Sequence, residues 1–157
     1  MKMIALPVLS LLVCFNALAV EALPPPNLEP GRYVLRKEVS KGQACVPNFE
    51  ARLGRTADGD LTVELGGRQG YVWRQMQGPP DRQGKCAYDS EQTLRVQGGE
   101  QIFVQVALEK CDDGAVSVGS ERRTLTLRRG EIDVKLETLR ESRRRWRTIS
   151  DCKYLRQ

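Results

Sequence analysis

The sequence predicts an all-β protein: a single antiparallel meander of about eight or nine strands that closes into a small barrel, with an open β-sandwich as the alternative. Three observations support this prediction. Apolar and polar residues alternate with a period of two in successive runs, and no segment keeps a helical period of about 3.6. Glycine and proline turns separate the runs at short intervals. Four cysteines follow an apparent export signal, which favours two disulfides.

The first residues read as a secretory signal peptide. Lys2 precedes an apolar stretch from Ile4 to Leu18, and small residues follow where a signal peptidase would cut. The stretch is shorter than the roughly 20 residues that a membrane-spanning helix needs. We therefore expect cleavage after Ala22, or after Ala19 as the alternative. Residues 1–22 are then removed, and the mature chain has no transmembrane segment.

Export places the protein in the periplasm or outside the cell, and the short basic start is of a bacterial type. The alternative is a lipoprotein that is anchored through acylated Cys14. Val13 is bulky where that processing expects a small residue, so the cleaved signal is the preferred interpretation.

Residues 23–30 read LPPPNLEP and contain four prolines. Proline fixes the backbone near the polyproline II conformation and removes amide donors, so we expect an extended leader. A plain spacer is the simpler interpretation, and a peptide ligand for a proline-binding partner is the alternative. The folded domain is expected to cover residues 31–157.

The predicted strands are the runs in which the alternation is clearest. They cover residues 33–38, 49–53, 61–65, 71–76, 93–97, 102–108, 123–128, 131–138 and 144–155. The turns between them are Asp58-Gly59, Gly66-Gly67, Gly78-Pro79-Pro80, Gly98-Gly99 and Arg129-Gly130. A first strand that lies beside the last one would close the barrel and remove its edges.

The turn at Arg129-Gly130 gives the clearest hairpin. One face pairs Leu127 with Ile132 and Leu125 with Val134. The other face pairs Arg128 with Glu131, Thr126 with Asp133 and Arg122 with Glu137. Because apolar residues meet apolar ones and charges meet opposite charges, we expect the first face to be buried and the second to be in water.

Cys86 and Cys111 are predicted to form one disulfide, and Cys45 and Cys152 the other. A two-residue turn at Gly98-Gly99 places Cys86 directly opposite Cys111. The second pairing follows by elimination, and it ties the start of the domain to its last strand.

The apolar residues around the same turn favour a different register. A shift of one residue would place Leu94 and Val96 on one face with Ile102, Val104, Val106 and Leu108. A three-residue loop or a β-bulge would reconcile this face with the cysteine pairing.

The amino-acid composition and the motifs of the chain do not favour a metal site or a catalytic site. The chain has no histidine, and its cysteines lack the close spacing of a zinc site. Asp58-Gly59-Asp60 and Asp112-Asp113-Gly114 do not continue into a calcium loop, and turn chemistry explains both. With cysteines oxidised and no G-x-S-x-G motif, no catalytic residue, metal or cofactor is expected.

The net charge of +5 is concentrated at the C-terminus, because residues 139–157 carry seven basic and two acidic side chains. A period of two places Trp146, Cys152 and Tyr154 on the inner face, Arg143, Arg145 and Arg147 outward, and Arg144 inward or at the start of the strand. A solvated charged face is the simpler interpretation. The alternative is an anion-binding surface made by these four arginines, whose planar forks suit phosphate and carboxylate.

These features predict a secreted or periplasmic, non-catalytic binding module with a basic C-terminal strand. Its expected partner is anionic: an envelope lipid headgroup, an acidic polysaccharide, nucleic acid or an acidic protein surface. The alternatives are an inhibitor of a secreted enzyme and a lipocalin-like carrier of a small apolar ligand. The oligomeric state is left open.

Overall fold

The computed structural model describes residues 23–67, 69–74, 76–77, 81–83, 86–111, 120–140 and 145–157. The predicted signal peptide with Cys14 lies outside these residues, as do Arg143, Arg144 and the predicted turns at 78–80 and 112–114. In the described part of the chain, no helix is long and apolar enough to cross a membrane.

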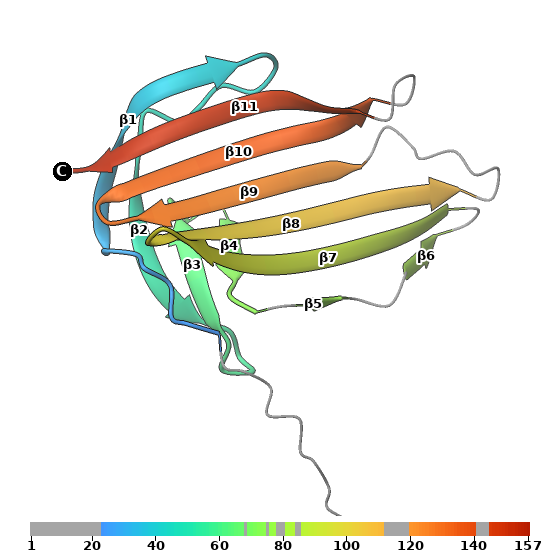
Figure 1. The fold of residues 1–157 in the computed structure, drawn as a ribbon, viewed down its shortest axis with the longest axis horizontal. Coiled ribbons are helices and arrows are strands. Elements are labelled where there is room, and N and C mark those ends of the chain that lie inside the picture. Colours follow the sequence, from blue (N-terminus) through green and yellow to red (C-terminus); the bar gives the residue numbers. More distant parts are fainter. Residues whose placement is uncertain are drawn as a thin grey trace, which may run out of the picture.

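The strands form one antiparallel sheet (Figure 1). They are β1 (Gly31–Ser40), β2 (Asn48–Arg55), β3 (Leu61–Leu65), β4 (Gln69–Val72), β5 (Met76–Gln77), β6 (Asp81–Gln83), β7 (Cys86–Gln97), β8 (Glu100–Cys111), β9 (Glu121–Arg128), β10 (Glu131–Arg140) and β11 (Arg145–Arg156). Two of the eleven, β5 and β6, have two and three residues. The remaining nine agree with the predicted number, and the all-β antiparallel fold is confirmed.

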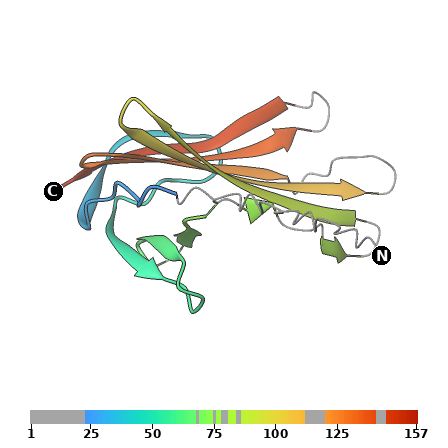
Figure 2. The ribbon, with the colours of Figure 1, turned by 60° about the horizontal axis from the view of Figure 1, so that its bottom comes forward.

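The sheet curls into a half-barrel. Its strand order is β4-β3-β2-β1-β11-β10-β9-β8-β7-β5, with β6 also on β7, so the first strand lies beside the last as predicted. The predicted closure is not reached, because β4 and β5, at the two ends of this order, do not pair with each other in the described chain. Figure 2 shows β2–β4 folded beneath the long strands β7–β11, which extend past them. The predicted strand at 71–76 is wrong as one unit. The chain leaves β4 after Val72 and joins the other end of the sheet at Met76.

The hairpin of β9 and β10 has the predicted register. Leu127 lies opposite Ile132 and Leu125 opposite Val134, and the two leucines and Ile132 are fully buried. The opposite, convex face of the sheet carries the charged pairs. It is not uniformly in water, because Glu137 is only 5% exposed.

The hairpin of β7 and β8 follows the two-residue turn, in which Gly98 and Gly99 both have positive φ angles. Cys86 lies directly opposite Cys111, and Leu94 lies opposite Phe103. No bulge interrupts this register. The predicted shared face is therefore wrong: Phe103 faces the core beside Leu94, whereas Ile102, Val104, Val106 and Leu108 line the convex face of β8.

Both predicted disulfides are present. Cys86 joins Cys111 across the β7–β8 hairpin, and Cys45 joins Cys152 over 107 positions of sequence. The long bridge fixes the loop after β1 onto the concave face of β11. It therefore links two segments that the sheet order also brings together.

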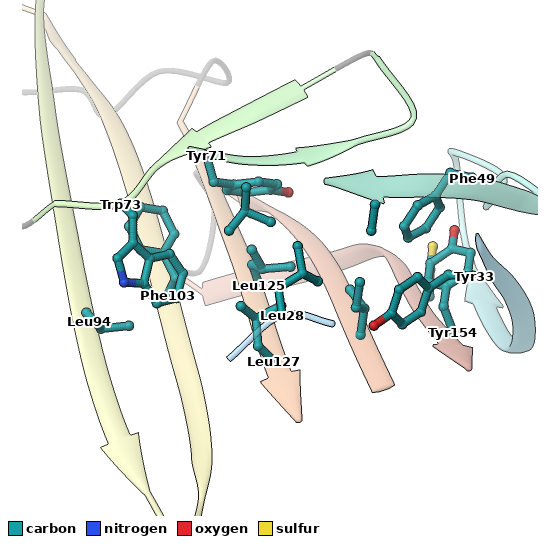
Figure 3. Close-up of a cluster of buried hydrophobic side chains, with 14 residues drawn as sticks. Leu28, Tyr33, Phe49, Tyr71, Trp73, Leu94, Phe103, Leu125, Leu127 and Tyr154 are labelled. Carbon is teal, nitrogen blue, oxygen red and sulfur yellow. The ribbon is translucent and has the colours of Figure 1, made fainter. Parts of the chain in front are cut away.

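The core fills the concave face of the half-barrel (Figure 3). Phe103 on β8 is 1% exposed; its ring stacks on Trp73 at 5.4 Å and meets the edge of Tyr71 at 5.9 Å. Because Tyr71 and Trp73 come from β4 and the residue after it, these contacts join one end of the sheet to β8, which is near the other end. The curl is therefore held by aromatic packing across the concave face.

Residues 23–30 pack against this core and are not a plain spacer. The side chains of Pro26 and Leu28 are buried, and Figure 3 shows Leu28 between Leu125 and Leu127. The indole Nε1–H of Trp73 donates a hydrogen bond to the carbonyl oxygen of Pro24 at 2.9 Å. The leader therefore closes one end of the half-barrel.

Candidate functional site

A β-bulge in β11 decides where the C-terminal arginines point. Leu136 on β10 lies opposite Ser150, and the next residue, Glu137, lies opposite Thr148, so Ile149 is the extra residue. A bulge of this kind reverses the alternation of side chains along the strand. Cys152 and Tyr154 face the core as predicted, but the residues before Ile149 change faces.

Trp146 therefore lies on the convex face, and its predicted place beside Cys152 and Tyr154 is wrong. It is opposite Leu139, and the Arg122 guanidinium lies 4.8 Å from the centre of its ring. This cation–π contact covers one side of the indole. The ring is half-buried at the surface and not in the core.

Arg145 and Arg147 lie on the same side of the sheet as the core. Arg147 is opposite Thr138, which follows Leu136 on the concave face of β10. Their predicted place on the outward face, opposite the core, is therefore wrong. Both side chains are exposed, because this end of β10 and β11 extends past the part of the sheet that β2–β4 cover (Figure 1). Within the described chain, neither has an ion-pair partner.

Two arginines of the convex face, Arg122 and Arg128, are in contrast paired with carboxylates. Arg128 pairs with Glu100 and Asp133 at 2.6 Å each. Glu137 accepts hydrogen bonds from Arg122 and from Lys135, at 2.6 and 2.7 Å. Arg145 and Arg147 thus place positive charge without local compensation on the concave side, at the open end of β11.

The buried carboxylate of Glu137 has an altered pKa. Burial raises this pKa, but the hydrogen bonds and positive charges of Arg122 and Lys135 outweigh burial and hold it below the ordinary value of 4.5. A lowered native pKa stabilises the fold at pH values above 4.5 and loses this effect as the pH falls through the native pKa.

We expect the free energy of unfolding to fall as the pH is lowered below 4.5, in part through Glu137. Glu137→Gln should reduce stability at pH 7 by about 1–3 kcal/mol, because it removes charge-assisted hydrogen bonds, and should make the acid decline shallower. Urea unfolding at a series of pH values measures both effects. Glu131→Gln, on the same face but more exposed, is the control. Parallel pH curves for wild type and Glu137→Gln would contradict this assignment.

A pocket of about 280 Å³ lies on the concave face, beside the arginine-rich end. Its walls come from the loop that carries Cys45 and from strands β2–β4 and β9–β11. The apolar part of the lining consists of Val46, Phe49, Leu65, Val134, Leu136, Cys152 and Tyr154. The volume is at the lower end of the range for small-molecule sites, where apolar walls and a few polar groups are usual.

Arg123 and Tyr71 supply the main polar groups of the pocket wall. Burial raises the pKa of the Tyr71 hydroxyl, and the nearby charge of Arg123 opposes this rise, so the phenol is neutral and can donate a hydrogen bond. Arg123 pairs with Glu121 through one nitrogen at 2.9 Å, and its side chain is 37% exposed. A guanidinium has five N–H donors, so this pair leaves donors that can bind an anion.

The pocket and the arginine-rich end form one continuous surface. Beyond Leu136 and Ser150 in the pocket, the next residues on the same face of β10 and β11 are Thr138 and Arg147. Of the predicted anion-binding residues, the structure places Arg145 and Arg147 on this surface. Arg143 and Arg144 are outside the described residues.

Sequence analysis did not identify Arg123, although a signal was present. In the predicted β9–β10 hairpin, Arg123 has the parity of Leu125 and Leu127, so it lies on the apolar face. Burying a lone arginine in such a row costs free energy, so an arginine at this position often binds an ion or a ligand. The pocket itself depends on the curl of the sheet, which the residue pattern does not give.

One cluster of metal-ligating residue types occurs in the described chain, at Cys86, Glu109 and Cys111. Both sulfurs are bonded to each other, so neither is a thiolate that could bind a metal. Comparisons of the chain with protein-family models, with curated proteins and with solved structures found no match.

Proposed function

We propose that this chain is an exported, non-catalytic binding protein that holds a small amphipathic anion on the concave face of its half-barrel. The ligand is a single acyl chain with an anionic head. The observation that carries the proposal is the bulge at Ile149, because it turns Arg145 and Arg147 onto the face that contains the pocket.

The chemistry of the surface supports a ligand with two parts. Phe49, Leu65 and Val134 offer apolar contacts in a small volume, which suits one short hydrocarbon chain. Arg123 and Tyr71 provide donors to a carboxylate or phosphate at the wall of the same pocket. Unpaired positive charge at the open end would attract such an anion and raise its association rate.

The inventory of the chain supports binding without catalysis. It has no histidine to act as a general base, and its four cysteines after the signal segment are bridged. The disulfides support an oxidising location, and we propose the periplasm or the extracellular space, after cleavage of the signal peptide. This proposal joins the predicted anionic partner with the predicted alternative of an apolar ligand.

Titration of the mature protein with decanoate, followed by calorimetry, tests the proposal. Arg123→Gln should weaken decanoate binding about tenfold, since one charge-assisted pair contributes about 1.4 kcal/mol or more. Decanol has the same tail without the charge, and it should bind more weakly than decanoate to the wild type. The preference for decanoate over decanol should be smaller in Arg123→Gln than in the wild type.

Arg95→Gln is the matched control, because Arg95 is exposed on β7 opposite the convex residue Ile102. It should leave decanoate binding unchanged. Absence of decanoate binding, or an equal loss in Arg95→Gln and Arg123→Gln, would overturn the proposal. Tight, strongly salt-dependent binding of DNA or an acidic polysaccharide with no decanoate binding would instead favour a polymeric anion.

A further inference from the structure

Side chains of the folded domain hold the leader, residues 23–30, through hydrogen bonds to its backbone. Gln101 on β8 makes two hydrogen bonds to it: its Nε2 donates to the carbonyl oxygen of Pro25 at 2.7 Å, and its Oε1 accepts from the backbone N–H of Asn27. Trp73 donates to Pro24, one residue earlier. Two donors and one acceptor thus bind backbone groups within residues 24–27 of an extended, proline-rich segment.

The side chains that hydrogen-bond to the leader are buried. With the leader in place, Gln101 is 6% exposed and Trp73 is 5% exposed, so their hydrogen bonds to the leader are shielded from water. Tyr33 is fully buried and its hydroxyl donates to the carbonyl oxygen of Glu29 at 2.9 Å. Without the leader, these buried polar atoms would lose their partners, which is costly.

Two leader side chains complete the fit. Pro26 and Leu28, two residues apart, are buried on the concave face. The Glu29 carboxylate pairs at the rim with Arg156 at 3.0 Å and with Arg129 at 3.4 Å. An aromatic N–H that donates to a proline carbonyl, beside apolar contacts, is the chemistry by which folded domains recognise polyproline II peptides.

We propose that the surface formed by Tyr33, Trp73 and Gln101 is a recognition site for proline-rich segments in the polyproline II conformation. The chain's own leader is its ligand in cis. A peptide with the same spacing, Pro-Pro-Pro-x-Leu, supplied by another polypeptide would take its place. Cleavage of the signal peptide gives the leader a free end at Leu23, so it can leave the site without breaking any strand pairing.

This site is distinct from the proposed anion pocket. The leader contacts lie at Gln101 and Leu127, near the β9–β10 turn, whereas the pocket lies at Arg123 and Leu136, farther along the same strands. Within the described chain, the residues that hydrogen-bond to the leader, Tyr33, Trp73 and Gln101, do not line the pocket. The two proposals can therefore fail separately.

The test uses the mature full chain and a fluorescent LPPPNLEP peptide, which is residues 23–30. Leu28→Ser in the protein removes the main apolar anchor of the cis leader and leaves the site intact. Anisotropy should show the peptide binding this variant about tenfold more tightly than the wild type, whose own leader competes. The variant peptide LPPPNSEP should bind poorly to both proteins.

Adding Gln101→Ala to Leu28→Ser should abolish the gain. Gln105→Ala is the matched control, because Gln105 has the same orientation four residues along β8 and makes no described contact with the leader. Equal peptide binding by wild type and Leu28→Ser, or none by a folded Leu28→Ser protein, would overturn the proposal. If Leu28→Ser does not fold, Pro26→Ala carries the same comparison. Decanoate binding should be unaffected by saturating peptide.

Discussion

Phe103→Ala is expected to lower the free energy of unfolding by about 3–5 kcal/mol, the range for truncating a buried phenylalanine. The ring is 1% exposed and lies between Trp73 and Tyr71, which belong to the opposite end of the sheet. Its removal leaves a cavity whose walls come from β4, β8 and β9, so the two ends of the half-barrel lose their shared contact. Urea unfolding of the mature protein measures the change.

Trp146→Ala is the informative comparison, because the ring is larger but lies on the convex face. We expect it to cost about 1–2 kcal/mol: the cation–π contact with Arg122 and some apolar burial are lost, but water fills the space. Val104→Ala, on the convex face of β8 beside Phe103, should cost about 1 kcal/mol. An equal loss for Phe103→Ala and Trp146→Ala would contradict the assignment of faces.

The sequence predicts hairpins well where residues on both strands constrain each other. Around Arg129-Gly130, apolar pairs and charged pairs agree on one register, and the structure has that register. Around Gly98-Gly99, the turn type and the cysteines give the correct register, whereas the apolar residues favour the wrong one. They do so because the apolar row of β8, which is Ile102, Val104, Val106 and Leu108, lies on the convex face, so the alternation along this strand does not mark the core.

The bulge at Ile149 cannot be predicted from a period of two in the sequence. Thr148, Ile149 and Ser150 are ordinary strand residues, and no glycine or proline marks the irregularity. One extra residue moves Trp146 off the core face and brings Arg145 and Arg147 onto it. The positive charge of the last strand is predictable from composition, but the face of the sheet that carries its arginines is not.

The leader is missed for a related reason. Four prolines in residues 23–30 correctly speak against hydrogen-bonded strand pairing, but they say nothing of what the segment packs against. Its partners, Trp73 and Gln101, are 49 and 76 positions away from the carbonyls they bind. Contacts of such separation depend on the curl of the sheet, which comes from tertiary packing and not from a local pattern.

Loss of the Cys45–Cys152 bridge is expected to destabilise the protein more than loss of Cys86–Cys111. In the chain-entropy model, a bridge contributes about 4.8 kcal/mol for a separation of 107 and about 3.5 kcal/mol for 25. Measured values usually fall between about 2 and 5 kcal/mol. Thermal and urea unfolding of Cys45→Ala/Cys152→Ala and Cys86→Ala/Cys111→Ala would measure the difference, expected to be about 1 kcal/mol.

The two bridge variants also separate stability from ligand binding. Cys45 and Cys152 line the pocket, and the loop they hold contributes Val46 to its wall, whereas Cys86 and Cys111 are not among the residues that line it. Cys45→Ala/Cys152→Ala should therefore weaken decanoate binding under conditions where both variants are fully folded, and Cys86→Ala/Cys111→Ala should not. If the two double variants lost equal stability, the predicted difference between the long and the short bridge would be wrong. Unchanged decanoate binding in the first variant would show that the loop after β1 is no part of the site, and that Arg123 and Arg147 act on a ligand held elsewhere.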